Sequence, residues 1–193
     1  MRVACVCAVI VTNLWAVPAS AQSMRPAANT VAVGGNVGFL APDNGPADGP
    51  QALQATTGSA DVFVEYYYTP RVSLRAMYGW ASPQFEAAPD QSLRRQHVNV
   101  NALVNWDLGR LRPFAGVGGG TYFLSRHEAG RRAGSSVTKP GGVLGWGAEY
   151  LLRTFALRSE MNVHILGEEK RLPGFDGKTL TAFTWTFGMK VAF

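Results

Sequence analysis

The last ten residues of the chain, TWTFGMKVAF (Thr184–Phe193), carry the clearest structural signal in the sequence. A large apolar side chain stands at every second position, and polar or small residues lie between, the apolar set being Trp185, Phe187, Met189, Val191 and Phe193. Strict alternation is the pattern of a β-strand with two different faces. The segment also ends on a phenylalanine, whereas unpacked chain ends are usually poorly ordered. The sequence therefore predicts a terminal strand that packing holds in place.

The same alternation recurs along the chain. In HVNVNALVNW (His97–Trp106) and VSLRAMYGW (Val72–Trp80), apolar residues share one face, and mainly polar or small residues share the other. We predict eight strands in all, at residues 31–40, 59–69, 72–80, 97–106, 112–125, 142–152, 155–165 and 180–193. In the strand at 112–125, glycines erase the alternation, so the pattern leaves its facing open.

The N-terminus has the features of a secretory signal peptide. Arg2 is followed by an apolar run over residues 3–17 and by the small-residue pattern ASA at residues 19–21. The apolar run is shorter than the roughly 20 residues of a membrane-spanning helix. We therefore predict a signal peptide at residues 1–21 and a single domain at residues 22–193. Cleavage would remove both cysteines, Cys5 and Cys7.

The connections between the predicted strands alternate in length. Short connections lie near residues 69–71, 107–111 and 153–154, and long ones cover residues 41–58, 81–92, 126–140 and 166–179. Up-and-down barrels of outer membranes have short turns at one end and longer loops at the other. The pattern therefore predicts an all-β fold, an eight-stranded antiparallel up-and-down transmembrane β-barrel.

The volume of the barrel interior decides which face looks outward. The apolar face carries twelve aromatic side chains: Phe39, Tyr66, Tyr68, Tyr78, Trp80, Trp106, Trp146, Tyr150, Phe183, Trp185, Phe187 and Phe193. An eight-stranded barrel has little more interior room than packed side chains fill. An Arg or Lys turned toward lipid at the membrane midplane would cost about 2–4 kcal/mol. We therefore expect the apolar face to look outward and the polar face to line the lumen.

Charged residues on the polar face can pair across neighbouring strands. A tight turn brings Glu65 opposite Arg75, and another brings Glu149 opposite Arg158, and opposite charges directly across a ladder stabilise it. We expect a lumen filled by an ion-pair network of Asp61, Glu65, Arg75, Glu149, Arg158, Glu160 and Lys190.

Three segments resemble a known family. The ending TFGMKVAF resembles the C-terminal assembly signal of bacterial outer-membrane barrels, with Gly188, Val191 and Phe193 in the signal positions. LRPFAGVGGGTYF (residues 111–123) and GGVLGWGAEYLLRTFALRSEMN (residues 141–162) resemble strands of small barrels similar to the OmpA transmembrane domain and its porin-like relatives. The resemblance implies a Gram-negative outer-membrane protein that is a monomer. It also implies contact with outer-membrane lipid and lipopolysaccharide, and with periplasmic chaperones and the barrel insertion machinery during assembly.

The candidate chemical sites are weak. Alternation places Ser159 on the face opposite Glu160 and His164, so these residues cannot form a nucleophile and base pair. The three histidines show no metal-ligand spacing, and a net charge of +5 without a dense basic run gives nucleic-acid binding little support. We expect no catalytic residue, no cofactor, no metal and no nucleic-acid partner.

The predicted connection at residues 126–140 is basic, with Arg126, Arg131, Arg132 and Lys139 against Glu128 alone. It is a candidate anion-binding loop for lipopolysaccharide phosphates or a polyanionic host surface, and the alternative is a solvated variable loop. The expected function is structural or surface interaction at the envelope, including adhesion. The alternatives are a narrow porin-like channel and, third, a lipid A hydrolase.

Overall fold

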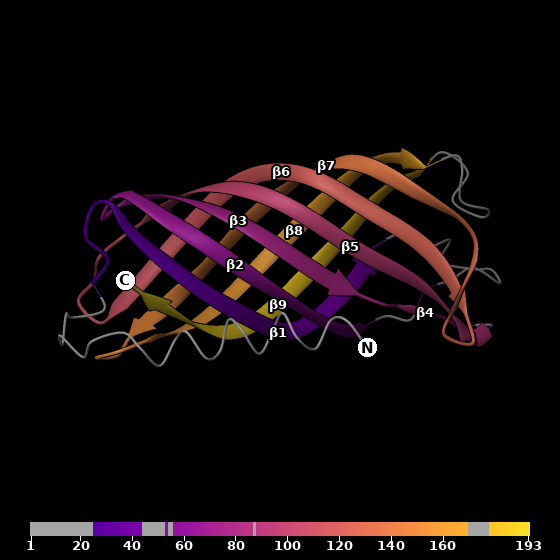
Figure 1. Ribbon diagram of the computed structural model, residues 1–193, viewed down its shortest axis with the longest axis horizontal. Coiled ribbons are helices and arrows are strands. Elements are labelled where there is room, and N and C mark those ends of the chain that lie inside the picture. Colours follow the sequence, from indigo (N-terminus) through magenta and orange to yellow (C-terminus); the bar gives the residue numbers. More distant parts are fainter. Residues whose placement is uncertain (1–24, 44–52, 54–55, 87, 170–177) are drawn as a thin grey trace.

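The computed structural model describes residues 25–43, 53, 56–86, 88–169 and 178–193, so the predicted signal peptide lies outside it. Within these residues the chain forms nine β-strands (Figure 1): β1 (Thr30–Asp43), β2 (Thr57–Thr69), β3 (Val72–Ala81), β4 (Gln84–Phe85), β5 (Ala88–Asn105), β6 (Leu111–Glu128), β7 (Arg131–Leu151), β8 (Ala156–Glu169) and β9 (Lys178–Ala192). Among the described residues, no helix is long and apolar enough to cross a membrane.

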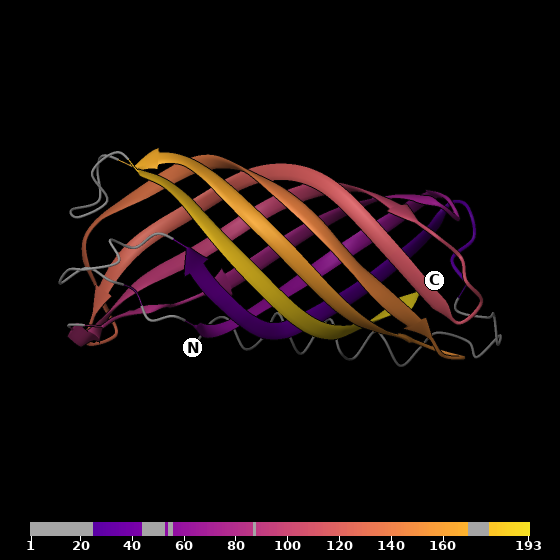
Figure 2. The same cartoon turned by 180° about the vertical axis from the view of Figure 1, so that it is seen from behind.

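The eight long strands close into an antiparallel barrel. Each pairs with the next long strand along the chain, β9 pairs back to β1, and β3 pairs directly with β5. The two-residue strand β4 is an addition that pairs with β5 at one end. Figures 1 and 2 show the strands running obliquely around one elongated barrel. The predicted eight-stranded up-and-down barrel is confirmed.

The two ends of the barrel differ. At one end, here called the short-turn end, brief connections join β2 to β3, β5 to β6 and β7 to β8. At the other, here called the long-strand end, β5, β6 and β7 extend well beyond their predicted limits. β6 and β7 meet there in a two-residue turn, Ala129–Gly130, whose φ values of 46° and 76° are those of a tight hairpin turn.

The prediction of long loops at residues 81–92 and 126–140 is therefore largely wrong. Ala88 to Ser92 belong to β5, and the segment from Arg126 to Pro140 is a paired hairpin interrupted by a register shift between Ser125 and His127. Beyond a membrane both faces of a strand meet water, so polar residues occupy both faces and the alternation fades while backbone pairing continues. Most of the predicted connection at residues 41–58, and residues 170–177, lie outside the described residues.

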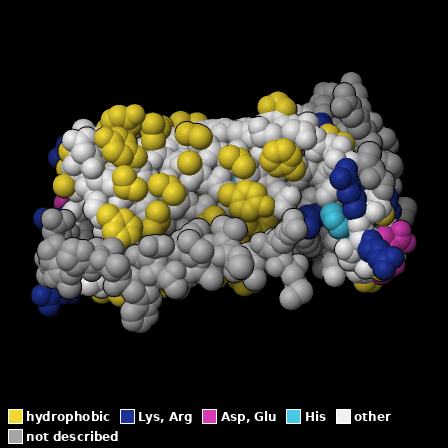
Figure 3. Space-filling view, viewed as in Figure 1, with side chains coloured by type: hydrophobic (Ala, Val, Ile, Leu, Met, Phe, Trp, Pro, Cys, Tyr) yellow, Lys and Arg dark blue, Asp and Glu magenta, His cyan; other side chains and the backbone are white. Residues whose placement is uncertain are grey.

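The apolar face of the sheet looks outward and the polar face lines the lumen, as predicted from the volume of the barrel interior. Trp80, Trp106, Trp146 and Trp185 lie on the outside and are 42–49% exposed, whereas Arg75 and Glu65 are fully buried inside. Figure 3 shows hydrophobic side chains spread over the barrel wall and charged side chains at its two ends. The strand whose facing the sequence left open, β6, turns Arg112, Phe114, Tyr122 and Leu124 inward and Leu111, Val117 and Phe123 outward.

Candidate functional site

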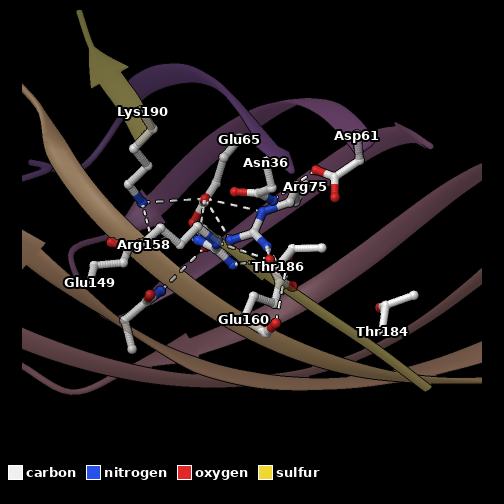
Figure 4. A network of polar contacts seen from close by, with 12 residues as sticks. Asn36, Asp61, Glu65, Arg75, Glu149, Arg158, Glu160, Thr184, Thr186 and Lys190 are labelled. Atoms are coloured by element: carbon white, nitrogen blue, oxygen red, sulfur yellow. Dashed lines mark hydrogen bonds and ion pairs between the residues drawn. The ribbon is translucent and has the colours of Figure 1, made fainter. Parts of the chain in front are cut away.

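The lumen is filled by a network of six charged side chains from five strands: Glu65 on β2, Arg75 on β3, Glu149 on β7, Arg158 and Glu160 on β8, and Lys190 on β9 (Figure 4). Each of these side chains is at most 1% exposed. Three cations face three carboxylates, so the charges within the network balance. Balance matters because a buried charge without a partner is costly.

Arg75 joins two of the carboxylates. Its Nη2 lies 2.9 Å from Oε2 of Glu65, and its Nη1 lies 3.1 Å from Oε1 of Glu160. Glu65 sits directly opposite Arg75 in the β2–β3 register, so a short-range pairing rule accounts for that contact. Glu160 belongs to a strand that is not adjacent to β3, so the second contact crosses the lumen.

Arg158 and Lys190 complete the network. Arg158 contacts Glu149, its direct partner in the β7–β8 register, and its Nη2 lies 2.8 Å from Oε2 of Glu160. Lys190 Nζ lies 2.6 Å from Oε1 of Glu149 and 3.4 Å from Oε2 of Glu65. The two hairpin pairs are linked to each other through Glu160 and Lys190, and directly by Arg158 Nη1, which lies 3.9 Å from Oε2 of Glu65, so the network connects opposite walls of the barrel.

Two phenylalanines hold the guanidinium groups from the side. The Cζ of Arg75 lies 4.8 Å from the ring centre of Phe63 and 5.5 Å from that of Phe114. The Cζ of Arg158 lies 5.3 Å and 3.9 Å from the same two rings. A cation over an aromatic face is attracted by the ring quadrupole. The aromatic rings thus add attraction to the ion pairs and fill the lumen between them.

Neither phenylalanine is among the residues that the sequence predicts for the lumen. Phe63 shares the parity of Asp61 and Glu65, so the alternation of β2 already contained the signal. Phe114 lies in the glycine-rich strand β6, where the pattern is erased. Room for its ring comes from Gly147 on the neighbouring strand, where a Cβ would lie 2.6 Å from Cζ of Phe114.

Asp61 stands outside the ion pairs, although the sequence placed it among them. Its Oδ1 accepts a hydrogen bond of 2.7 Å from Nδ2 of Asn36, and it forms no ion pair within the described part of the chain. The reason is register, because Asp61 faces Gly79 on β3 and Asn36 on β1 rather than a cation.

A second polar cluster lies in the lumen toward the long-strand end. Tyr122 accepts a hydrogen bond of 3.1 Å from Nδ2 of Asn99, and its hydroxyl lies 2.9 Å from Nδ1 of His164. The His97 ring lies beside both rings, with centroids 5.4 Å and 5.1 Å away. Neither nitrogen of His97 has a hydrogen-bond partner among the described residues, and His97 and His164 line a small cavity of about 10 Å³. In the described residues, no three His, Cys, Asp or Glu side chains are grouped to hold a metal ion.

Beyond this cluster the interior becomes apolar. Six buried side chains from five strands pack together there: Phe85, Leu93, Tyr122, Leu124, Val137 and Leu166. Leu53, Ala88 and Leu180 pack against them. The interior therefore changes from an ion-pair network to a polar cluster and then to an apolar cluster toward the long-strand end.

The four cations of the predicted anion-binding loop do not share a face. Arg126 Nε donates to Oε1 of Gln91 at 3.2 Å on the inner side, and Lys139 Nζ donates to the Gly167 carbonyl at 3.3 Å. Arg131 stands opposite Glu128, while Arg132 stands opposite His127 on the outer face. A single basic loop is thus the wrong description, because these residues belong to a paired hairpin whose side chains alternate between faces.

The residues of the predicted assembly signal lie on β9 and just after it. Gly188 faces the lumen, where a Cβ would collide with the backbone of Gly35 and with Asn36. Phe193 is 45% exposed on the outside, and its backbone N–H donates to the Val31 carbonyl at 2.8 Å. Val191 pairs with Val33 in the β1–β9 ladder that closes the barrel. Their reading as an assembly signal stays a prediction.

The candidate catalytic side chains are separated by the barrel wall. Ser159 is on the outside, where its hydroxyl accepts a hydrogen bond of 3.1 Å from Nε1 of Trp185. Glu160 and His164 are buried in the lumen. The geometry offers no nucleophile and base pair among these three residues.

An aromatic and aliphatic exterior, a charge-paired interior and short turns at one end define the class of membrane-spanning β-barrels of outer membranes. A family model, that of the outer membrane protein beta-barrel domain, matches residues 7–193. The chain belongs to this family. The match begins within the predicted signal peptide.

Solved structures share the fold at low sequence identity. Neisserial surface protein A (NspA) aligns with a TM-score of 0.63 and 14% identity over 85% of this chain and 97% of that chain. Ail, the attachment invasion locus protein of Yersinia pestis, aligns with a TM-score of 0.56 and 11% identity over 86% and 99%. The outer membrane protein OprG from Pseudomonas aeruginosa gives 0.53 and 10% over 89% and 99%. A comparison with curated proteins gave no match.

Proposed function

We propose that this protein is a non-enzymatic surface protein of a Gram-negative outer membrane, with a closed lumen and a structural or surface-interaction role. The observation that carries the proposal is the buried network of Glu65, Arg75, Glu149, Arg158, Glu160 and Lys190, which joins opposite walls of the barrel. In outer-membrane barrels the longer connections face the cell exterior, so the long-strand end is the external end.

Passage of an ion through this lumen would require separating buried pairs. Removing one partner of a buried pair commonly costs about 3–5 kcal/mol, because the other charge is left uncompensated. The apolar cluster around Tyr122 and Leu124 adds a second closure at the external end. A barrel closed at two levels supports a role at its surface rather than in its interior.

The external part of the barrel supplies the surface for such a role. The paired β6–β7 hairpin lies at the same end of the barrel as β4 (Figure 1). Two proteins with the same fold are named a surface protein and an attachment invasion locus protein, and those names fit a role for this fold at the cell surface.

Conductance in planar bilayers tests the closed lumen. We expect the purified, refolded barrel to give currents near the background of the bare bilayer. The double substitution Arg75→Ala with Glu160→Ala removes one of the contacts that cross the lumen, the ion pair between β3 and β8, and we expect it to raise the conductance. Discrete, long-lived openings of the unaltered barrel at low voltage would contradict the proposal.

A narrow channel is the second candidate, and one observation favours it. His97 and Arg95 carry buried nitrogen atoms without hydrogen-bond partners in the described residues, and both line the small cavity. Water in that cavity would provide the partners. A channel function predicts openings in the unaltered barrel that disappear when the cavity is filled by Ser59→Leu, whereas the closed barrel is silent in both forms.

A further inference from the structure

The outward face of the sheet formed by β5, β6 and β7 changes character along one row of residues. On β5 the outward side chains from Val98 to Trp106 are apolar and exposed, and the next one toward the external end is Gln96. A tilted strand needs about 9–11 residues to cross the hydrocarbon layer, which is the length of this apolar stretch. Opposite Gln96 stand Trp80 on β3 and Phe123 on β6, both exposed. Since aromatic side chains mark the membrane interface, this row lies where acyl chains give way to headgroups.

Basic and hydroxyl side chains lie directly beyond that row on the same outward face. The next row contains Arg94, Ser125 and Ser136, paired across β5, β6 and β7. One row further, Ser92 stands opposite His127, which stands opposite Arg132. We call Arg94, Ser125, His127, Arg132 and Ser136 the outer rim cluster. Figure 3 shows basic side chains gathered around a histidine at this end of the barrel, with an acidic side chain beside them.

The cluster has the dimensions of a single headgroup site. Neighbouring strands lie about 4.8 Å apart and successive outward residues about 7 Å apart, so the five side chains emerge within an area of roughly 10 by 7 Å. Arg132 Nη2 donates to the Ser136 hydroxyl, which ties two members together. Arg94 is exposed and has no ion pair or hydrogen bond within the described residues.

One acidic side chain near the cluster, Glu128, is turned away from it, and another, Asp90, lies one row beyond it on the same outward face. Glu128 stands opposite Gln91 and Arg131 on the inner side of the hairpin. Asp90 shares the outward face of β5 and lies two residues beyond Ser92, about 7 Å along the strand from the row of His127 and Arg132 and about 13 Å from Arg94. Among the described residues, no acid stands on the outward face between the aromatic row and the cluster. The two guanidinium groups of Arg94 and Arg132 outnumber the neighbouring carboxylate of Asp90, so the cluster keeps a net positive charge.

We propose that the outer rim cluster binds the phosphate groups of an outer-leaflet glycolipid, the lipopolysaccharide of the same membrane. The level of the cluster selects this occupant, because a lipid whose acyl chains pack on Val98 and Phe123 places its headgroup at Arg94. The two guanidinium groups match phosphate oxygens in charge and geometry, and the serine hydroxyls add donors. A soluble polyanion would gain nothing from the apolar wall below. The site rests on the outer-membrane part of the proposed function and is independent of the closed lumen.

Lipid binding by the purified barrel tests the site. The barrel in neutral detergent micelles is titrated with fluorescently labelled, bisphosphorylated lipid A, and binding is measured by thermophoresis. We expect Arg94→Gln with Arg132→Gln to weaken binding at least about tenfold, since hydrogen bonds to charged groups are the strong ones. The matched control, Arg71→Gln with Arg131→Gln, also removes two positive charges, one from each end of the barrel. It should change binding by less than about twofold.

Fully dephosphorylated lipid A separates phosphate recognition from acyl-chain contact. We expect it to bind the unaltered barrel at least about tenfold more weakly than the bisphosphorylated form. Equal binding of the two lipids, or an equal loss in the control variant, would overturn the site. Folding of each variant is checked by heat-modifiable migration in gels. If the double variant does not refold, the single variant Arg94→Gln replaces it in the binding test, and we expect it to bind several-fold more weakly than the unaltered barrel. Conductance should be unaltered in every variant, so the outcome is separable from the test of the closed lumen.

Discussion

Arg75 and Glu160 lie 85 positions apart in the sequence, and Nη1 of Arg75 stands 3.1 Å from both carboxylate oxygens of Glu160. The contact joins β3 to β8 across the lumen, so it links the pairs that each hairpin forms within itself. The interior of the barrel is therefore one connected network rather than two separate salt bridges.

Loss of Arg75 should destabilise the barrel strongly. In Arg75→Met the carboxylates of Glu65 and Glu160 lose their shared cation inside a closed lumen. We expect the free energy of unfolding to fall by about 3–5 kcal/mol, measured by urea unfolding in micelles with tryptophan fluorescence. The control Arg71→Met removes an exposed charge from the β2–β3 turn and should stay within about 0.5 kcal/mol. Equal stabilities of the two variants would show that the network contributes little.

Gly147 should be far less tolerant of a methyl group than Gly142 on the same strand. A Cβ at Gly147 would collide with the Ser159 carbonyl and lie 2.6 Å from Cζ of Phe114, whereas at Gly142 the nearest atom is 3.9 Å away. We expect Gly147→Ala to cost about 1–3 kcal/mol, as overpacking does, and Gly142→Ala to be neutral. Refolding yield and urea unfolding measure both, and a neutral Gly147→Ala would contradict the close packing of Phe114.

The hydroxyl of Tyr122 should matter more than that of Tyr78. Tyr122→Phe leaves Asn99 Nδ2 and His164 Nδ1 without their partner inside the lumen, and unsatisfied buried groups cost about 1–3 kcal/mol each. Tyr78→Phe removes a hydroxyl on the outer face, where Gln96 donates to it at 2.7 Å and solvent can replace it. Urea unfolding of the two variants gives the comparison, and a loss no larger in Tyr122→Phe would mean that water replaces the hydroxyl inside the lumen.

The alternation of side chains was sufficient to predict the barrel and its facing. Lipid on one side and a narrow lumen on the other impose opposite chemistries on successive residues, so Trp185 and Lys190 reveal their sides directly. Adjacent-strand rules likewise account for Glu65 opposite Arg75. These predictions depend only on residues that are close in sequence or on adjacent strands, so the sequence alone is sufficient for them.

The contacts across the lumen and the external hairpin could not be predicted from the sequence. Whether Arg75 meets Glu160 depends on the stagger of the closed barrel, which no single strand encodes. The facing of Phe114 was hidden because its glycine neighbours remove the pattern. The sequence does not single out Arg94, because it lies outside the predicted strand at 97–106, and only the pairing of β5 with β6 and of β6 with β7 brings Ser125 and Ser136 beside it.

The β6–β7 hairpin should be ordered beyond the membrane. Backbone pairing runs out to Glu128 and Arg131 with one register shift between Ser125 and His127, so hydrogen exchange measured by mass spectrometry in micelles should show protected amides at the paired positions of both strands up to the turn. Gly130 has a φ of 76°, and Gly130→Val places a β-branched residue in the left-handed region at a cost of about 1–2 kcal/mol. That cost should raise local exchange near the turn roughly 5- to 30-fold, while amides of β6 within the apolar wall stay protected as an internal control. Unprotected amides throughout residues 124–137 of the unaltered protein would show that this segment is a loop after all.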